Sequence, residues 1–211
     1  MTLPRLYPIL DTGVLERRRC GLVEAAEAML EGGAGILQLR HKGHFTRALF
    51  DDAERVATSC RGIGTIFVVN DRADMARLLE AGAHIGQDDL PPREARSVLG
   101  EGAPLGFSTH NAAQLEAAAA EPADYLALGP IFATGSKENP DPVVGVERLR
   151  SWRTLTTRPL VAIGGIGLAN AREVLDAGAD SVAVIGDLLA EPCTRQTLRQ
   201  RVEQWLQLLT P

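Results

Sequence analysis

The sequence lacks any long apolar run. Nowhere do about 18 apolar residues follow one another, which is close to the length that a membrane-spanning helix needs. The opening residues, MTLPRLYPILDTG, also lack the apolar stretch of a secretion signal. The three cysteines (Cys20, Cys60 and Cys193) are far apart and have no C-x-x-C spacing, which argues against disulfides and a structural zinc site. We therefore expect a soluble, cytoplasmic protein without a membrane partner.

The chain also lacks an excess of basic residues. It has 22 Lys and Arg against 27 Asp and Glu, a formal net charge of −5, so a nucleic-acid-binding face is not expected. Among its four histidines there is no H-E-x-x-H motif, and there is no G-x-S-x-G motif, so neither a zinc hydrolase nor a serine nucleophile is indicated. A small anionic ligand remains compatible with these counts, because its site needs only a few cations or a metal ion.

What is present is a regular alternation of strands and helices within 211 residues, without a linker or a change of composition, which predicts a single domain over 1–211. The strands are short and apolar, as in parallel sheets that are buried on both faces. Eight such units predict a (β/α)₈ TIM barrel, with an open doubly wound sheet as the alternative. The expected strands are 6–10, 36–39, 65–69, 83–86, 104–108, 124–129, 160–163 and 181–185. The expected helices are 23–30, 45–60, 73–80, one opened by Pro91 and Pro92, one capped by Asn111, one from Val146, 169–177 and 195–209.

Polar residues follow most of the predicted strands at their carboxyl ends. Because these ends open on one face of a barrel, where the active site of such enzymes lies, we expect the side chains to meet there. They are Gln38, Arg40 and Lys42; Asn70 and Asp71; Asp88 and Asp89; Ser108; and Thr134, Ser136 and Lys137.

The charged members of this set have complementary chemistry. Arg40, Lys42 and Lys137 are suited to binding phosphate oxygens. Asp71 and Asp89 are hard oxygen ligands, and Mg²⁺ typically takes one or two carboxylates together with substrate phosphates. The alternative is structural: Arg40 could pair with Asp71, and Lys42 with Asp89, across the barrel mouth.

Glycines end the last two strands. Gly164, Gly165 and Gly167 follow one strand and Gly186 follows the next, each at the end where a helix is expected to begin. Backbone N–H groups without a neighbouring Cβ can approach an anion closely, and a helix N-terminus adds partial positive charge. In barrels the loops after strands seven and eight recurrently bind phosphate. The glycines could instead serve only as tight turns.

Seven stretches in order, over nearly the whole chain, resemble the thiamine-phosphate synthase family. They are QLRHK, VVND, HIGQDD, GFSTH, LGPIFATGSK, AIGGI and SVAVIG. The resemblance implies a (β/α)₈ barrel that joins a hydroxymethylpyrimidine diphosphate to a thiazole phosphate and requires Mg²⁺. The product would be thiamine phosphate, with diphosphate released.

The resemblance also implies roles for individual residues. Asp71 and Asp89 would bind Mg²⁺. The pyrimidine diphosphate would contact Gln38, Arg40, Lys42, Asn70, Ser108 and Lys137, of which Arg40, Lys42, Ser108 and Lys137 would be catalytic. The thiazole phosphate would contact Thr134, Ser136, Gly165, Ile185 and Gly186. The chain departs from the family pattern twice, because T-x-T-K reads T-G-S-K here and the serine common after the last strand is Gly186.

Two other functions remain open. One is a thiazole phosphate tautomerase of a related branch, which would use a histidine such as His110 and would not need the diphosphate-binding residues. The other is a non-catalytic sensor of a phosphorylated ligand, which would not need carboxylates for a metal. The length and the glycine and proline content of segment 132–144 suit a lid. The sequence does not indicate an oligomeric state.

Overall fold

In the computed structural model, which describes residues 1–135, 141–189 and 191–210, eight parallel strands pair in chain order and close into a barrel. The first strand pairs with both the second and the last, with Tyr7 opposite Ala183. Because the two edges of the sheet meet, the predicted TIM barrel is confirmed and the open doubly wound sheet is excluded. The strands are β1 (Leu6–Asp11), β2 (Ile36–Arg40), β3 (Ile66–Asn70), β4 (Gly82–Ile85), β5 (Leu105–Thr109), β6 (Tyr125–Leu128), β7 (Leu160–Ile163) and β8 (Ser181–Val184).

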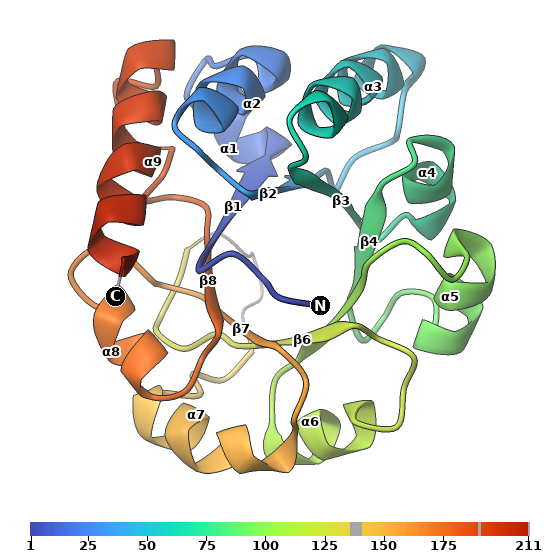
Figure 1. Ribbon diagram of the computed structural model, residues 1–211, viewed down its shortest axis with the longest axis vertical. Helices are drawn as coiled ribbons and strands as arrows, with labels where there is room; N and C mark the ends of the chain where they lie inside the picture. Colours follow the sequence, from blue (N-terminus) through green and yellow to red (C-terminus); the bar gives the residue numbers. More distant parts are fainter. Residues whose placement is uncertain (136–140, 190, 211) are drawn as a thin grey trace.

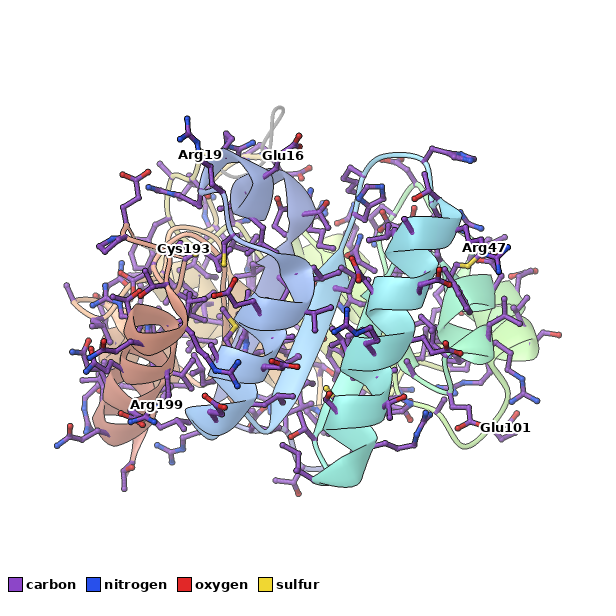
Figure 2. All side chains as sticks on the ribbon, turned by 90° about the horizontal axis from the view of Figure 1, so that it is seen from above. Glu16, Arg19, Arg47, Glu101, Cys193 and Arg199 are labelled. Carbon is purple, nitrogen blue, oxygen red and sulfur yellow. The ribbon has the colours of Figure 1, made fainter. Side chains whose placement is uncertain are left out.

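Helices surround the barrel in a ring (Figure 1). On one side α2 lies between α9 and α3 and contacts both (Figure 2). The helices in the described residues are α1 (Thr12–Arg17), α2 (Leu22–Glu31), α3 (Arg47–Gly62), α4 (Ala73–Leu78), α5 (Pro92–Leu99), α6 (Ala112–Ala118), α7 (Val146–Trp152), α8 (Ala171–Asp176) and α9 (Arg195–Leu209), with a 3₁₀ turn at Arg153–Leu155.

The strands are buried on both faces, which explains their almost continuous apolar sequences. Side chains that point inward fill the barrel with a small core that includes Tyr7, Val68 and Tyr125. Side chains that point outward pack against the helices in a much larger core. Leu3, which precedes β1, also belongs to the inner core and closes the end of the barrel opposite the carboxyl ends of the strands.

The sequence placed most elements within two residues of their observed ends, and β7 and α9 match at both ends. Two sequence signals for the start of a helix are confirmed in detail. The Asn111 carboxamide oxygen accepts a hydrogen bond of 2.9 Å from the backbone N–H of Gln114 at the start of α6. Pro92 is the first residue of α5, where its missing N–H costs no hydrogen bond.

Two local predictions differ from the structure. Helix α1 was not predicted, because Asp11 ends β1 and also caps the helix by accepting a 2.9 Å hydrogen bond from the Val14 N–H. After β8 a turn occupies 186–189, and α9 begins only at Arg195, so no α-helix starts directly at Gly186.

All three cysteines lie in the described residues and are free thiols. Burial is the main reason that the pKa of the Cys20 thiol is raised to about 12, and the neighbouring Cys193, marked in Figure 2, raises it further. Across the described part of the chain, no helix has both the length and the apolar composition needed to cross a bilayer.

Candidate active site

A cavity of about 660 Å³ opens at the carboxyl ends of the strands. Ile9, Ala127 and Val161 contribute an apolar surface to its lining, while charged groups come from the end of β2 and from loops that follow several strands, those after β2, β3 and β4 among them. Of the site residues expected from the sequence, Ser136 and Lys137 lie outside the described residues. The structure brings all the others together in the cavity wall: Gln38, Arg40, Lys42, Asn70, Asp71, Asp89, Ser108, Thr134, Gly165, Ile185 and Gly186.

Asp71 and Asp89 meet on one side of this cavity. The Lys42 ammonium lies 2.6 Å from a carboxylate oxygen of Asp71. Asp89 accepts a 2.7 Å hydrogen bond from the Gly86 N–H. Burial, and then the hydrogen-bonded carboxyl of Asp71, raise the pKa of the Asp89 carboxyl above its ordinary value. Two carboxyl groups in contact disfavour the charged form of each other, and a nearby cation relieves that repulsion.

This pair fits a magnesium ion in its donor atoms. Both residues offer the hard oxygen ligands that Mg²⁺ prefers, and Mg²⁺ usually takes no more than two carboxylates from a protein and completes its octahedron with water and substrate phosphate. Among the residues that the structure describes, no cluster of three or more His, Cys, Asp or Glu could hold a metal ion. A metal at Asp71 and Asp89 would therefore depend on the substrate for further ligands.

Asp71 has a left-handed backbone, with φ of +66°. Aspartate and asparagine tolerate this conformation better than most other residues with a side chain. The Asp71 N–H donates a 2.7 Å hydrogen bond to the carbonyl of His84 at the end of β4, which holds the conformation in place. The turn therefore aims the carboxylate at the loop after β4, where Asp89 lies.

Arg40 pairs with a residue that we did not predict. Its guanidinium donates to the Asp11 carboxylate, which is buried and also caps α1. Both ion pairs considered from the sequence are therefore wrong: Arg40 pairs with Asp11, and Lys42 pairs with Asp71. The ion pair with Asp11 fixes the guanidinium at the cavity rim. An arginine that is anchored by one edge keeps its remaining N–H groups for a ligand.

Asn70 is the last residue of β3, and the residue is 9% exposed. Within the described residues its side-chain amide nitrogen has no hydrogen-bond partner, although the atom is buried. Leaving a buried donor unpaired is costly, so such groups commonly await a ligand or an ordered water. Asn70 therefore offers the cavity an unused N–H donor.

The turn after β7 can be built only with glycine. Gly164 and Gly165 have φ of +100° and +65°. A Cβ on Gly165 would lie 2.5 Å from the carbonyl oxygen of Ala133, in the loop that follows β6. This close contact places the β7 turn against the segment that contains Thr134. By contrast, a Cβ on Gly186 would meet no atom within 4 Å, so the turn after β8 faces open space in the cavity.

Asp187 fixes the turn after β8, and no pattern in the sequence pointed to it. Its carboxylate accepts hydrogen bonds of 2.8 Å from the Arg201 guanidinium and from the Trp205 indole, both on α9. Arg201 also donates to the Asp187 backbone carbonyl at 3.0 Å. The charge of Asp187 is thereby neutralised beside Gly186, where an unpaired carboxylate would repel an anion.

A buried chain of hydrogen bonds crosses the barrel beneath the cavity. The Gln38 amide donates to the Tyr7 hydroxyl at 3.0 Å, and the two tyrosine hydroxyls lie 2.7 Å apart. Tyr125 lies 3.2 Å from Nδ1 of His84, whose Nε2 lies 2.8 Å from the Ser108 hydroxyl. Burial lowers the pKa of His84 to about 4, so its ring is neutral near pH 7. Only Gln38 and Ser108 of this chain were expected at the site.

His110 lies at the cavity and also at the start of a helix. It precedes Asn111, the cap of α6, and its N–H donates a 2.7 Å hydrogen bond to the side chain of Gln114. Its Nδ1 lies 2.7 Å from the carbonyl oxygen of Gly129 and 3.5 Å from a carboxylate oxygen of Asp141. The histidine thus ties the end of β5 to the end of β6.

A closed parallel barrel with a charged cavity at the carboxyl ends of its strands is the arrangement of a (β/α)₈ enzyme. The paired carboxyl groups, the anchored cations and the glycine turns fit anionic substrates. The family model for thiamine monophosphate synthase matches residues 6–188, and the chain belongs to this family.

Similar proteins span almost the whole chain. A thiamine-phosphate synthase of Koribacter versatilis is 48% identical over 212 residues, which is 99% of this chain and 97% of the relative. One from Chloroflexus aurantiacus is 40% identical over 197 residues, 93% of this chain and 90% of the relative. The solved thiamine phosphate pyrophosphorylase of Pyrococcus furiosus is 33% identical, with a TM-score of 0.80, and the match covers 98% of this chain and 97% of that one.

Proposed function

We propose that this chain is a magnesium-dependent transferase that makes thiamine phosphate in the cytoplasm. It would join 4-amino-2-methyl-5-hydroxymethylpyrimidine diphosphate to 4-methyl-5-(2-hydroxyethyl)thiazole phosphate and release diphosphate. Membership of the family, and the names of relatives up to 48% identical, support thiamine-phosphate synthase activity. The observation that carries the proposal is that Asp71 and Asp89 meet beside Lys42 in a cavity that also holds two glycine turns.

In this proposal the pyrimidine diphosphate lies on the side of β2 to β5. Arg40 and Lys42 bind the diphosphate oxygens, together with Lys137, which is outside the described residues. Gln38 and Ser108 hold the pyrimidine ring, and the unpaired amide nitrogen of Asn70 donates to the same substrate. Mg²⁺ would be held by Asp71 and Asp89 and, when bound, would stabilise negative charge on the leaving diphosphate.

The thiazole phosphate lies on the other side, at the ends of β6 to β8. Gly165, Ile185 and Gly186 supply backbone contacts to the phosphate, and Thr134 supplies a hydroxyl, with Ser136 proposed beside it. The helix dipole adds little after β8, because α9 begins only at Arg195. The turn would therefore depend on its own N–H groups, and the pairing of Asp187 with Arg201 removes a repulsive charge beside it.

The proposed reaction is a dissociative substitution. The bond between the pyrimidine methylene carbon and the diphosphate oxygen breaks, and its electron pair leaves with the oxygen. The thiazole nitrogen then gives its lone pair to the methylene carbon, so that no proton has to be removed. Catalysis of this kind depends on stabilising the leaving group's charge and on holding two substrates in contact. The apolar lining that includes Ile9, Ala127 and Val161 would keep water from the cationic carbon.

One assay tests the function. The protein is incubated with both substrates and Mg²⁺, and we expect stoichiometric thiamine phosphate and diphosphate. Rearranged thiazole phosphate without coupling would instead identify a tautomerase, and binding without any product would identify a sensor. The position of two cations, Arg40 and Lys42, in the cavity wall favours the synthase, because neither alternative needs a diphosphate site.

A serine at position 186 is expected to strengthen thiazole phosphate binding. Because a Cβ at Gly186 would meet nothing within 4 Å, Gly186→Ser should add a hydroxyl donor without strain. One hydrogen bond to a charged group is typically worth about 1.5–3 kcal/mol, so it should lower the KM for thiazole phosphate roughly 10-fold or more and leave the KM for the pyrimidine diphosphate unchanged. Steady-state kinetics with each substrate varied in turn measures both constants.

Gly102→Ser is the matched control, because a Cβ at Gly102 also meets nothing within 4 Å and the residue does not line the cavity. This control should leave both KM values unchanged. If Gly186→Ser does the same, the turn after β8 does not contact the thiazole phosphate.

A further inference from the structure

The buried chain of hydrogen bonds joins two residues that contact the cavity from different walls. Gln38 belongs to β2 and Ser108 to β5, and both line the cavity. Tyr7, Tyr125 and His84 connect them through the inside of the barrel, and each of these three is at most 8% exposed. Buried polar networks with every member satisfied hold their side chains in one arrangement.

The amide nitrogen of Gln38, at one end of the chain of hydrogen bonds, fixes the direction of the donors. With its Nε2 facing Tyr7, the Gln38 amide can only donate, so the Tyr7 hydroxyl accepts and passes its own proton toward Tyr125. Tyr125 in turn donates to Nδ1 of His84. A neutral imidazole that accepts at Nδ1 carries its proton at Nε2, so His84 donates to the Ser108 oxygen.

This direction of the hydrogen bonds leaves a donor for a ligand at Ser108 and an acceptor at Gln38. The Ser108 oxygen already accepts from His84, so its O–H is available as a donor. The Gln38 amide uses one N–H on Tyr7 and keeps its carbonyl oxygen as an acceptor. A 4-aminopyrimidine matches both, since its amino group donates and its adjacent ring nitrogen accepts. A 4-oxopyrimidine inverts the pair, because its oxygen accepts and its ring N–H donates.

We propose that Tyr7, Tyr125 and His84 are positioning residues that fix the hydrogen-bonding polarity of Gln38 and Ser108, and thereby select an aminopyrimidine over its oxo counterpart. The inference rests on the proposed function, because it takes the pyrimidine to be the ligand at Gln38 and Ser108. It adds to that function a cause for base selectivity beyond the contacts of Gln38 and Ser108, in a network of which Tyr7 and His84 also reach the cavity wall.

Gly106 shows how closely the network is packed. A Cβ at this position on β5 would lie 2.2 Å from the Tyr125 ring and 2.4 Å from Nδ1 of His84. The ring centroids of His84 and Tyr125 are 5.6 Å apart and tilted by 32°. Only glycine leaves room for the two rings at their hydrogen-bonding distance, so the backbone of β5 is shaped to the network.

The test uses Tyr125→Phe, which removes the central hydroxyl and keeps the ring. Calorimetry gives the Kd of 4-amino-2-methyl-5-(phosphooxymethyl)pyrimidine, of its 4-oxo counterpart and of thiazole phosphate. We expect the unaltered protein to prefer the amino compound by about 100-fold. Tyr125→Phe should weaken amino binding by about 10-fold and reduce the preference to about 10-fold or less, because His84 is free to change tautomer. Thiazole phosphate should bind as before.

Thr109→Val is the matched control. The Thr109 hydroxyl is fully buried on the same strand as Ser108 and donates at 2.8 Å to the Ala127 carbonyl, outside the network. Both variants should lower Tm, but only Tyr125→Phe should change the amino-to-oxo preference. Tyr7→Phe provides a second test, because it removes the partner of Gln38 and leaves the His84–Ser108 bond in place; it should weaken amino binding with a smaller change in preference.

Two results would overturn the inference: an unaltered protein that does not discriminate between the two pyrimidines, or a preference in Tyr125→Phe equal to that of Thr109→Val. These measurements need no turnover. Failure of the unaltered protein to make thiamine phosphate would reject the proposed function separately.

Discussion

Asp71→Asn is expected to lower kcat for thiamine phosphate formation by at least about 100-fold at saturating Mg²⁺, a loss typical of removing one group that stabilises developing charge. Asparagine tolerates the left-handed backbone at this position, with φ of +66°, so the turn should keep its shape. The lost negative charge should also weaken binding of Mn²⁺, used as a probe for Mg²⁺ in electron paramagnetic resonance titrations, by about 10-fold or more.

Asp74→Asn provides the control for Asp71→Asn. Asp74 lies three residues further along the chain, pairs with Arg72 at 2.6 and 2.8 Å on the exterior, and does not line the cavity. Its substitution makes the same change of charge nearby and should leave kcat and Mn²⁺ affinity within about twofold, since exposed ion pairs contribute little. Near-normal turnover in Asp71→Asn would show that the metal assignment is wrong.

Arg40→Gln is expected to reduce kcat/KM for the pyrimidine diphosphate by about 100-fold, because a neutral amide cannot balance the charge of the departing diphosphate. The substitution also leaves the buried Asp11 carboxylate without its cation. Removing one partner of a buried ion pair typically costs on the order of 3–5 kcal/mol of stability, so Tm should fall as well.

The double variant Asp11→Asn with Arg40→Gln separates these two effects. An asparagine side chain in place of Asp11 would still accept a hydrogen bond from the Val14 N–H as the cap of α1, and it carries no unpaired charge. We expect circular dichroism melting to recover most of the lost Tm while kcat/KM stays about 100-fold low. Recovery of activity together with Tm would mean that Arg40 stabilises the barrel mouth and does not bind the diphosphate.

The order of strands and helices could be predicted because each strand is an apolar run with a clear end signal. The two prolines at the start of α5 and the cap at Asn111 even predicted helix starts correctly. Helix α1 was missed because Asp11 serves as the last residue of a strand, a helix cap and the partner of Arg40. One residue with three structural roles leaves no separate sequence signal for the helix.

The polar rim of the site was also predictable, since side chains at strand ends must meet on one face of a barrel. The network beneath the rim was not. Tyr7, His84 and Tyr125 lie within the strands, where the sequence suggests ordinary core residues. They meet across the inside of the barrel from β1, β4 and β6, which are not neighbours in the sheet. A usable signal existed, because both tyrosines of the chain lie within predicted strands, and a buried tyrosine usually needs a partner for its hydroxyl.

The pairing of β1 with β8 has a consequence for synthesis of the protein. Strand β1 leaves the ribosome early but gains its second neighbour only when residues 181–184 have followed. Until then, the nascent sheet has two unpaired edges, which are templates for association with other chains. The turns after β7 and β8 are also made last. A growing polypeptide therefore completes its glycine-built pocket at about the same stage of synthesis at which the unpaired sheet edges close. We expect it to need chaperones before that stage.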